Sequence, residues 1–593
     1  MSPRLLRLSI ISFAQIILFD LLWSMTFTMR SFSMAETYVN AILGALLLIL
    51  PYVIFRRVWI QLIVFLIADA LMVSNMMYAR TYFTFIPLDS YMLVGNLADF
   101  KASVAAQMRW SDILLPLAAI GGSVWAWRAP KGTSSKSLYI YGLATVVAIL
   151  LSLGVNAMHG GFAKHYRKTY NECYKSTCVT PMYTLAGNAI YSMISSKEAN
   201  SPEELAFARA WLEEHREITD AMQPDSTAAA PKSLVLILLE SFEPWLLNKE
   251  VEGQTLTPHL NSLLRDSTTL FFPNVVTQVS SGRSIDAQLL ILAGLMPMTD
   301  VSYSFNYPDN EYPTLVKAMK ERRDTRAYLL SPDKAVTWNQ APIARAFGID
   351  TLLMEPSWEV TERIGSGRGK LSDRALAKQI ISKMKAGEVF PEGESAFVQI
   401  ITYSGHNPFQ LPDELKALKF SKDIDTGLAD YMNMAHFTDE AIGELIDYLS
   451  SREDYKDMMV VITGDHEGLA DWRQRLIKDP VASQIISAEQ LTPMIILNGN
   501  RGGIGTVERH IGQIDIYPTL LHLAGLEKYA WKGLGTDALS PRGASRPFAF
   551  VTMTGELTGD TSGVAQREVE HIASTVRAST AIIRNNELKN TIK

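Results

Sequence analysis

The chain has 593 residues, of which 48% are hydrophobic, and its 55 Lys and Arg residues face 61 Asp and Glu residues. This composition excludes a disordered chain and a polybasic nucleic-acid binder, so no nucleic-acid partner is expected. Two cysteines likewise exclude a disulfide scaffold and a cysteine-rich zinc protein.

The apolar excess is concentrated in the first 160 residues. A mean hydropathy of +0.08 is high for a wholly soluble chain of this size. The first 160 residues carry 11 Lys and Arg against 6 Asp and Glu, a net charge of +5, which leaves −11 for the remainder. The chain therefore divides into a membrane-like part and an acidic, more polar part.

Five apolar runs predict a transmembrane domain of five helices in residues 1–158. A helix needs about 20 mainly apolar residues to cross a bilayer, and the second and fourth runs reach that length only with flanking residues. A cleaved signal peptide would explain the first run alone, and buried core helices are the remaining alternative. The runs are 5–25, 38–54, 58–77, 113–127 and 138–155.

The loops between these runs carry Lys and Arg unevenly, with seven on one side and four on the other. The richer side faces the cytoplasm in most membrane proteins, which predicts an N-terminus inside. An odd number of spans then places the residues after 160 outside the cytoplasm. Cys173 and Cys178 would lie on that oxidising side, where a disulfide and two free thiols both fit the sequence.

After residue 160 the chain becomes polar and then alternates between short apolar runs and helical patterns. Residues 201–218 predict a helix, because Pro202 and two glutamates stand at its start, and residues 219–232 predict a linker. The predicted segments are a helical linker at 159–231, the main domain at 232–560 and a C-terminal extension at 561–593.

The alternation after residue 232 predicts a mainly parallel sheet covered by helices on both faces. The candidate strands are 234–239, 326–330, 397–402, 458–463 and 493–497. The candidate helices are 258–266, 285–293, 314–321, 373–385, 431–450 and 515–523.

Four of these strands are followed by side chains that bind metals or phosphates. Ligands bind beyond the carboxyl ends of strands in such sheets, and these ends present Glu240, Asp333, His406 and Asp465-His466. The two carboxylates and the imidazole of Glu240, Asp465 and His466 suit Mn²⁺, Zn²⁺ or Mg²⁺. Any one of these residues alone also fits an ordinary polar strand end.

Ser284 is the candidate nucleophile, because it follows a glycine-containing turn and opens the apolar helix 285–293. A hydroxyl or bound anion at a helix N-terminus gains from the helix dipole and from free N–H groups. A metal on the same oxygen would lower the pKa of the hydroxyl. Spacing alone favours the simpler reading, in which Ser284 only caps the helix.

Six motifs together resemble the lipoteichoic acid synthase family, a branch of the alkaline phosphatase and sulfatase superfamily. They occur in the family's order, the predicted N-terminal spans match, and the resemblance covers nearly the whole chain. The motifs are Leu239-Glu240-Ser241-Phe242, Gly282-Arg283-Ser284-Ile285-Asp286-Ala287, Trp338-Asn339, Ser404-Gly405-His406-Asn407-Pro408-Phe409, Gly464-Asp465-His466 and Asp515-Ile516-Tyr517-Pro518-Thr519.

The resemblance implies a sulfatase-like α/β catalytic domain at 232–560 that holds one divalent metal, with Mn²⁺ favoured over Zn²⁺ or Mg²⁺. Glu240, Asp465 and His466 would bind the ion, and Ser284 would be both its fourth ligand and the nucleophile. The family usually has Thr at that position, and Ser keeps the hydroxyl. His406 matches the histidine that contacts the phosphate or the leaving group.

The resemblance also implies a headgroup pocket. Asp333 and Trp338 match residues that line the glycerophosphate site, and we assign Asn339 and Arg283 to substrate binding with them. Two departures concern this pocket. The chain-building synthases have His and Arg where this chain has Ser331 and Gln340. Without that cationic phosphate clamp, the headgroup and the formation of a polymer stay open.

The implied function is a multi-pass enzyme of the bacterial cytoplasmic membrane with its catalytic domain on the periplasmic side. It would transfer phosphoglycerol from the phospholipid phosphatidylglycerol to a glycan or glycolipid of the cell envelope, through a phosphoserine. Phosphatidylethanolamine as donor is the close alternative. A sulfatase-like hydrolase is the third, although the C/S-x-P-x-R frame of ordinary sulfatases is missing at Ser284.

Overall fold

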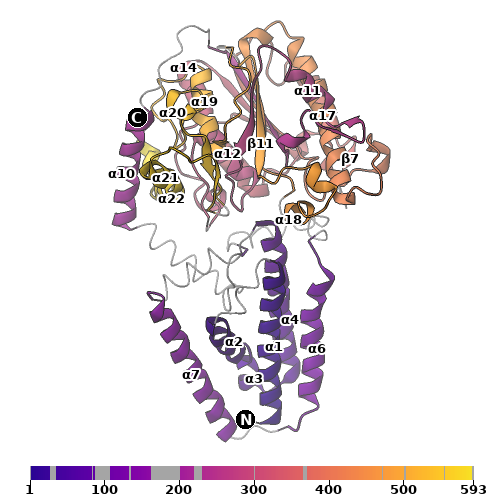
Figure 1. The fold of residues 1–593 in the computed structure, drawn as a ribbon, viewed down its shortest axis with the longest axis vertical. Helices are drawn as coiled ribbons and strands as arrows, with labels where there is room; N and C mark the ends of the chain where they lie inside the picture. Colours follow the sequence, from indigo (N-terminus) through magenta and orange to yellow (C-terminus); the bar gives the residue numbers. More distant parts are fainter. Residues whose placement is uncertain are drawn as a thin grey trace. The chain divides into compact units, whose positions relative to one another are not determined.

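The computed structural model of the chain divides into two compact units, one with helices α1 to α7 and one from helix α10 onward (Figure 1). Cys173 and Cys178, and residues 220–229 of the predicted linker, lie outside the described residues. The structure describes residues 2–26, 35–82, 85–86, 107–131, 135–161, 201–219, 230–299, 301–364, 370–469, 472–499, 503–552 and 555–590.

The first unit is helical, and four of its described helical segments are long and apolar enough to cross a membrane. These spans are Pro3–Thr26, Thr37–Phe55, Val58–Arg80 and Ser135–Met158. The helices of the unit are α1 (Pro3–Thr26), α2 (Ala35–Leu48), α3 (Leu50–Phe55), α4 (Val58–Tyr82), α6 (Leu114–Trp127) and α7 (Ser135–Met158).

The predicted count of five spans is not confirmed, because the fourth apolar run forms only the 14-residue helix α6. At 1.5 Å per residue this helix measures about 21 Å, against about 30 Å for the hydrocarbon core. Polar residues lie at both ends of this helix. Asp112 lies just before the helix in a buried ion pair with Arg80 (2.6 Å), and Arg128 is its C-terminal cap.

The second unit contains an eight-stranded sheet in the order β12-β4-β11-β10-β1-β9-β5-β6. The strands from β10 to β6 are all parallel, whereas β11 runs antiparallel to both β10 and β4. The strands are β1 (Ser233–Leu239), β4 (Leu270–Val276), β5 (Arg326–Leu330), β6 (Thr351–Leu353), β9 (Ala396–Ile401), β10 (Met458–Gly464), β11 (Leu491–Leu497) and β12 (Ile511–Gly512). A mainly parallel central sheet is confirmed.

Alternate residues of each central strand build two separate cores, because successive side chains of a strand point to opposite faces. In β1, Leu234, Leu236 and Leu238 enter one core, and Val235, Ile237 and Leu239 enter the other. All seven residues of β1 are buried. A strand buried on both faces reads as an unbroken apolar run, which is why its position was predictable.

Helices cover both faces of the sheet, as Figure 1 shows around β11. One core contains residues of α12 (Ser284–Ala293), α14 (Leu315–Arg322), α15 (Gln340–Phe347) and α19 (Ile516–Leu523). The other contains residues of α11 (Pro258–Leu263), α16 (Asp373–Lys385) and α17 (Thr426–Ser450).

Segments predicted to lie outside the main domain add to its first core. Helix α10 (Pro202–Thr219) contributes Ala208 and Trp211, and α22 (Thr575–Asn585) contributes Ala578 and Ile582. The Trp211 indole also donates a hydrogen bond to the carbonyl of His571 (3.1 Å) in α21 (Gln566–Ala573) and stacks on the His571 ring. The helices before and after the predicted domain are therefore part of its packing.

We expect Trp211→Ala to lower the free energy of unfolding of the second unit by about 3 kcal/mol, the usual cost of removing a buried aromatic side chain. Denaturant titration of the full-length protein in detergent measures this change. Glu213→Ala, an exposed position on the same helix, is the matched control. Equal stability of the two variants would show that α10 does not support the core.

Candidate metal centre and active site

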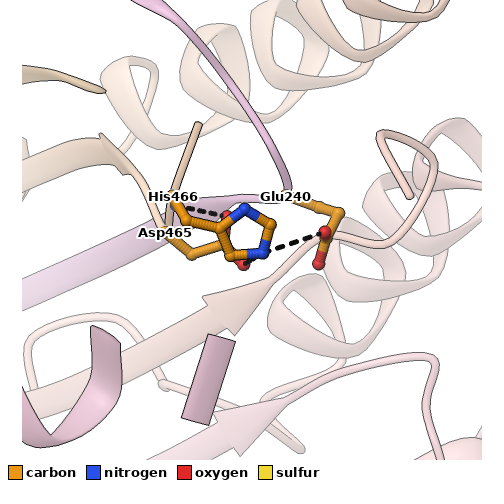
Figure 2. Close-up of side chains that lie close together, drawn as sticks. All are labelled: Glu240, Asp465 and His466. Carbon is orange, nitrogen blue, oxygen red and sulfur yellow. Dashed lines mark hydrogen bonds and ion pairs between the residues drawn. The ribbon is translucent and has the colours of Figure 1, made fainter. Parts of the chain in front are cut away.

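The candidate metal centre lies where two parallel strands end side by side. Strands β1 and β10 pair in register, with Leu239 beside Gly464, so the next residues along the two strands meet at one corner. Donor atoms of Glu240, Asp465 and His466 all lie within 4.8 Å of one another, and all three residues are buried. Figure 2 shows the three side chains converging.

Ser284 joins this group from a different element, the first residue of α12. Its Oγ lies 3.2 Å from Glu240 Oε2 and 3.5 Å from His466 Nε2. That ring nitrogen is also 3.5 Å from Glu240 Oε1 and from Asp465 Oδ2. The four residues assigned to the metal from the sequence are thus brought together around one point.

The chemistry of these donors fits a divalent cation. Asp465 Oδ1 accepts the backbone N–H groups of Ser241 and His466, each at 2.8 Å. Its Oδ2 is buried and lies 3.5 Å from His466 Nε2. Burial, and then the charge of Glu240, raise the pKa of Asp465 to about 6. A cation would compensate a carboxylate that is otherwise costly to bury.

His466 is held in the neutral form that a metal ligand requires. Burial, and next the positive charge of Arg283, lower the pKa of His466. Its Nδ1 lies 3.0 Å from the carbonyl oxygen of Glu467, which accepts a hydrogen bond from that nitrogen when the proton is on Nδ1. Such a bond to the far nitrogen of a ligating histidine leaves Nε2 as the free lone pair, and Nε2 is the atom that faces Ser284.

Arg283, predicted to bind substrate, is buried behind the metal centre. Its guanidinium pairs with the Glu467 carboxylate (2.6 Å) and donates to the Glu467 carbonyl (2.9 Å). Its Nη2 also lies 2.9 Å from His466 Nδ1, and because a guanidinium only donates, the two nitrogens share the Glu467 carbonyl as acceptor when the proton is on Nδ1. Burial raises the pKa of Glu467, but the charge and the hydrogen bond of Arg283, with smaller contributions from other neighbours, together outweigh it and the pKa is lowered. These contacts favour positioning of His466 over contact with substrate.

The turn that presents Ser284 is strained and is held by one carboxylate. Arg283 has φ +48°, a region that costs energy for a residue with a side chain. Asp286 Oδ2 accepts the N–H groups of Ser280 (2.9 Å) and Gly282 (3.0 Å). A Cβ on Gly282 would meet Asp286 at 2.3 Å, so only glycine fits there. Asp286 stood in a matched motif, but no role was predicted for it.

His406 follows β9, the strand on the other side of β1 from β10. A Cβ on Gly405 would lie 2.1 Å from the Glu240 carbonyl oxygen, so this loop packs directly on the Glu240 backbone. Asp373 Oδ1 fixes the loop by accepting the N–H groups of Tyr403 (2.8 Å) and Ser404 (3.0 Å). Asp373 begins α16, and no sequence motif pointed to it.

The remaining predicted residues lie at the end of β5 and the start of α15. Asp333 Oδ1 pairs with Lys370 (2.7 Å), a residue that the sequence analysis did not identify.

The segment that carries Trp338 and Asn339 has an unusual backbone. Both residues have positive φ, and the Asn339 amide donates a hydrogen bond to the Ser304 carbonyl (2.7 Å). Gln340 bonds to Gln288 of α12 (2.9 Å), so this segment lies against the helix that carries Ser284.

Residues 232–526 match the family model described as sulfatase. The lipoteichoic acid synthase of Staphylococcus aureus is 24% identical over 506 residues, covering 82% of this chain and 75% of that protein. A crystal structure of a lipoteichoic acid synthase from Listeria monocytogenes superposes with a TM-score of 0.53 at 20% identity, over 63% of this chain and 98% of that one. A protein of the alkaline phosphatase superfamily from Vibrio parahaemolyticus gives 0.50 at 17% identity, over 65% and 96%.

We expect Mn²⁺ to raise the melting temperature of chelator-treated protein, because it would bind the folded state and compensate the buried carboxylates. Ligand at a hundredfold excess over its Kd adds about 2.7 kcal/mol. Asp465→Asn should abolish the shift, as followed by thermal melting of the full-length protein in detergent. A shift of equal size in Asp465→Asn would place the metal elsewhere.

Arg283→Met should weaken Mn²⁺ binding by about 10- to 100-fold, the usual cost of removing support from behind a metal-ligating histidine. Titration calorimetry on metal-free protein measures the affinity, and thermal melting of that protein separates the loss from general destabilisation. Arg265→Met, at an exposed position, is the control. Unchanged affinity in Arg283→Met would contradict the positioning role.

Proposed function

We propose that the chain is a membrane-bound phosphoglycerol transferase, because residues 232–526 match the sulfatase family and lipoteichoic acid synthases are among its relatives. Phosphatidylglycerol would be the donor, and a glycan or glycolipid of the cell envelope the acceptor. The observation that carries the proposal is the Ser284 hydroxyl, which the N-terminus of α12 presents to Glu240 and His466.

The proposed reaction has two displacements at phosphorus. The Ser284 oxygen forms a bond to the phosphorus of the lipid, and the bond from phosphorus to the diacylglycerol oxygen breaks. The serine loses its proton, and the departing oxygen gains one to give diacylglycerol. A hydroxyl of the acceptor then forms a bond to the same phosphorus and loses its proton, while the bond from phosphorus to the Ser284 oxygen breaks and the serine regains a proton. Both steps conserve the phosphodiester charge.

We assign three tasks to the residues of the site. Ser284 is the nucleophile, and the positive end of the α12 dipole favours its deprotonated form. His406, in the loop that packs on Glu240, donates the proton to the departing oxygen and removes it from the acceptor. Glu240, Asp465, His466 and Ser284 hold the cation, with Mn²⁺ favoured over Zn²⁺ or Mg²⁺.

A cation at this position would supply positive charge to the phosphoryl oxygens in the transition state and stabilise the ionised serine. The group Glu240, Asp465 and His466 supports this assignment by its buried, mixed oxygen and nitrogen donors. The tight approach of Ser284 to two of these ligands supports a shared ion.

The proposed location is the bacterial cytoplasmic membrane, with several spans and the catalytic unit on the outer side. The four apolar helices support the anchoring. The excess of Lys and Arg in one set of loops supports an N-terminus inside. A donor lipid would then never leave the bilayer that anchors the enzyme, so no apolar chains need to be extracted into water.

Ser284→Ala should lower diacylglycerol release from fluorescent phosphatidylglycerol by about a thousandfold or more, as expected for loss of a covalent nucleophile. Ser284→Thr, which keeps the hydroxyl, should retain activity. The assay uses purified full-length protein with Mn²⁺, with phosphatidylethanolamine measured in parallel.

Three results of this assay would contradict the proposal. Release from phosphatidylethanolamine alone would identify a phosphoethanolamine transferase. Cleavage of neither lipid by metal-loaded protein would exclude a lipid donor and direct the test to sulfate and phosphate esters. Undiminished release by Ser284→Ala would exclude this serine as the nucleophile.

A further inference from the structure

An ion pair that no motif predicts lies at the carboxyl end of β5. Lys370, in the short strand β8 (Lys370–Leu371), places its Nζ 2.7 Å from Asp333 Oδ1. The Lys370 side chain is 7% exposed and that of Asp333 is 19% exposed. A lysine is rarely buried to this extent without a paired charge, so its ammonium is committed to this carboxylate.

The pair belongs to the same edge of the sheet as the nucleophile. Strand β9 lies between β1 and β5, so the end of β5 is about 10 Å from the end of β1 at the usual strand spacing. Side chains bridge this gap. The Lys370 ammonium lies 5.6 Å from the centre of the Tyr403 ring, and that ring stacks on His406 at 5.2 Å.

A hydrogen bond also connects the segment around Trp338 to α12, the helix that carries Ser284. Gln288 lies one turn after Ser284 on α12, so the two side chains share a helix face. Gln288 bonds to Gln340 (2.9 Å), which begins α15 just after Trp338. The segment that carries Trp338 is therefore packed against the helix that presents Ser284.

Two polar residues of the same segment, Ser331 and Gln340, carry no charge and make internal hydrogen bonds. Ser331 is buried and its Oγ accepts the N–H of Asp333 (3.3 Å). The Gln340 amide is buried in its pair with Gln288. Lys370 is thus the buried positive charge of this region.

We propose that Lys370 and Asp333 form the subsite that selects the donor headgroup, and that they favour a neutral polyol such as glycerol over an ammonium such as ethanolamine. This proposal rests on the proposed transferase function. The ammonium of Lys370 neutralises Asp333 and repels a second cation placed beside it. The pair also presents a donor next to an acceptor, which matches a hydroxyl, because a hydroxyl both donates and accepts.

The Asp333 carboxylate has the geometry for such a contact. Its Oδ1 receives Lys370, the N–H of Lys334 (2.7 Å) and the Thr337 hydroxyl (3.2 Å). Within the part of the chain that the structure describes, no hydrogen bond is donated to its Oδ2. Trp338, one residue after Thr337, stands beside Phe305 with the ring centres 6.3 Å apart, which adds an apolar wall for the glycerol carbons.

The test compares kcat/KM for diacylglycerol release from fluorescent phosphatidylglycerol and phosphatidylethanolamine in the full-length, Mn²⁺-loaded protein. Lys370→Gln removes the charge but keeps a donor toward Asp333. It should lower the preference for phosphatidylglycerol at least about tenfold, because the freed carboxylate attracts the ethanolamine ammonium. Lys370→Arg should keep the preference. Lys383→Met on α16, which removes a surface ion pair with Glu388 beyond the end of that helix, should leave the lipid preference unchanged.

Each further outcome decides the proposal. An equal loss on both lipids in Lys370→Gln, or an unchanged ratio, would reduce Lys370 to a structural support and overturn the subsite. A wild type that prefers phosphatidylethanolamine would overturn the direction of selection. A wild type that cleaves neither lipid would instead overturn the transferase function itself, so the wild-type protein is assayed before any variant.

Asp333→Asn tests the carboxylate of the pair. It should lower diacylglycerol release from phosphatidylglycerol without raising release from phosphatidylethanolamine. A rise with phosphatidylethanolamine would contradict the role of the carboxylate.

Discussion

The register between β1 and β10 is the constraint on which the site depends. Since the two strands are parallel and end together at Leu239 and Gly464, Glu240 and Asp465 must leave the sheet at one buried corner. Two carboxylates in such a place repel each other and lose hydration, and both effects raise the pKa of Asp465. The imidazole of His466 and the hydroxyl of Ser284 complete the candidate set of cation donors at this corner.

Two strained turns bring the remaining groups to this corner. Ser241 has φ +56° and so directs its N–H to Asp465, and Arg283 has φ +48° and so starts α12 with Ser284 facing the carboxylates. Conformations of this kind persist only where the surroundings hold them. Arg283 satisfies that condition with its own side chain, since the guanidinium that follows the turn is fixed by Glu467. Backbone strain and ligand orientation are therefore maintained by the same ion pair.

The parts of the fold and site that sequence reasoning could reach are those with a local signature. Strands buried on both faces read as apolar runs, and the residues that follow them, such as Glu240 and Asp465, could be placed at one edge by topology alone. Asp373 and Lys370 could not, because their partners lie about 30 to 40 positions away and the pairing appears only after folding. Strand β4 was missed for a related reason, since Pro273 and Asn274 interrupt its apolar pattern.

The fifth span and the segment boundaries also depend on contacts between distant positions, which local sequence patterns do not reveal. Apolar length predicted a membrane helix at α6, but its extent is set by Asp112 and its pair with Arg80, a contact between distant positions. Composition likewise suggested that the main domain begins after a linker, whereas α10 and α22 supply Trp211 and Ile582 to its core. These helices lie outside residues 232–526, the part that matches the sulfatase family. The unit that must fold to hold the candidate metal corner is thus larger than the segment that carries its motifs, and the additional helices complete the apolar core on the α12 side of the sheet.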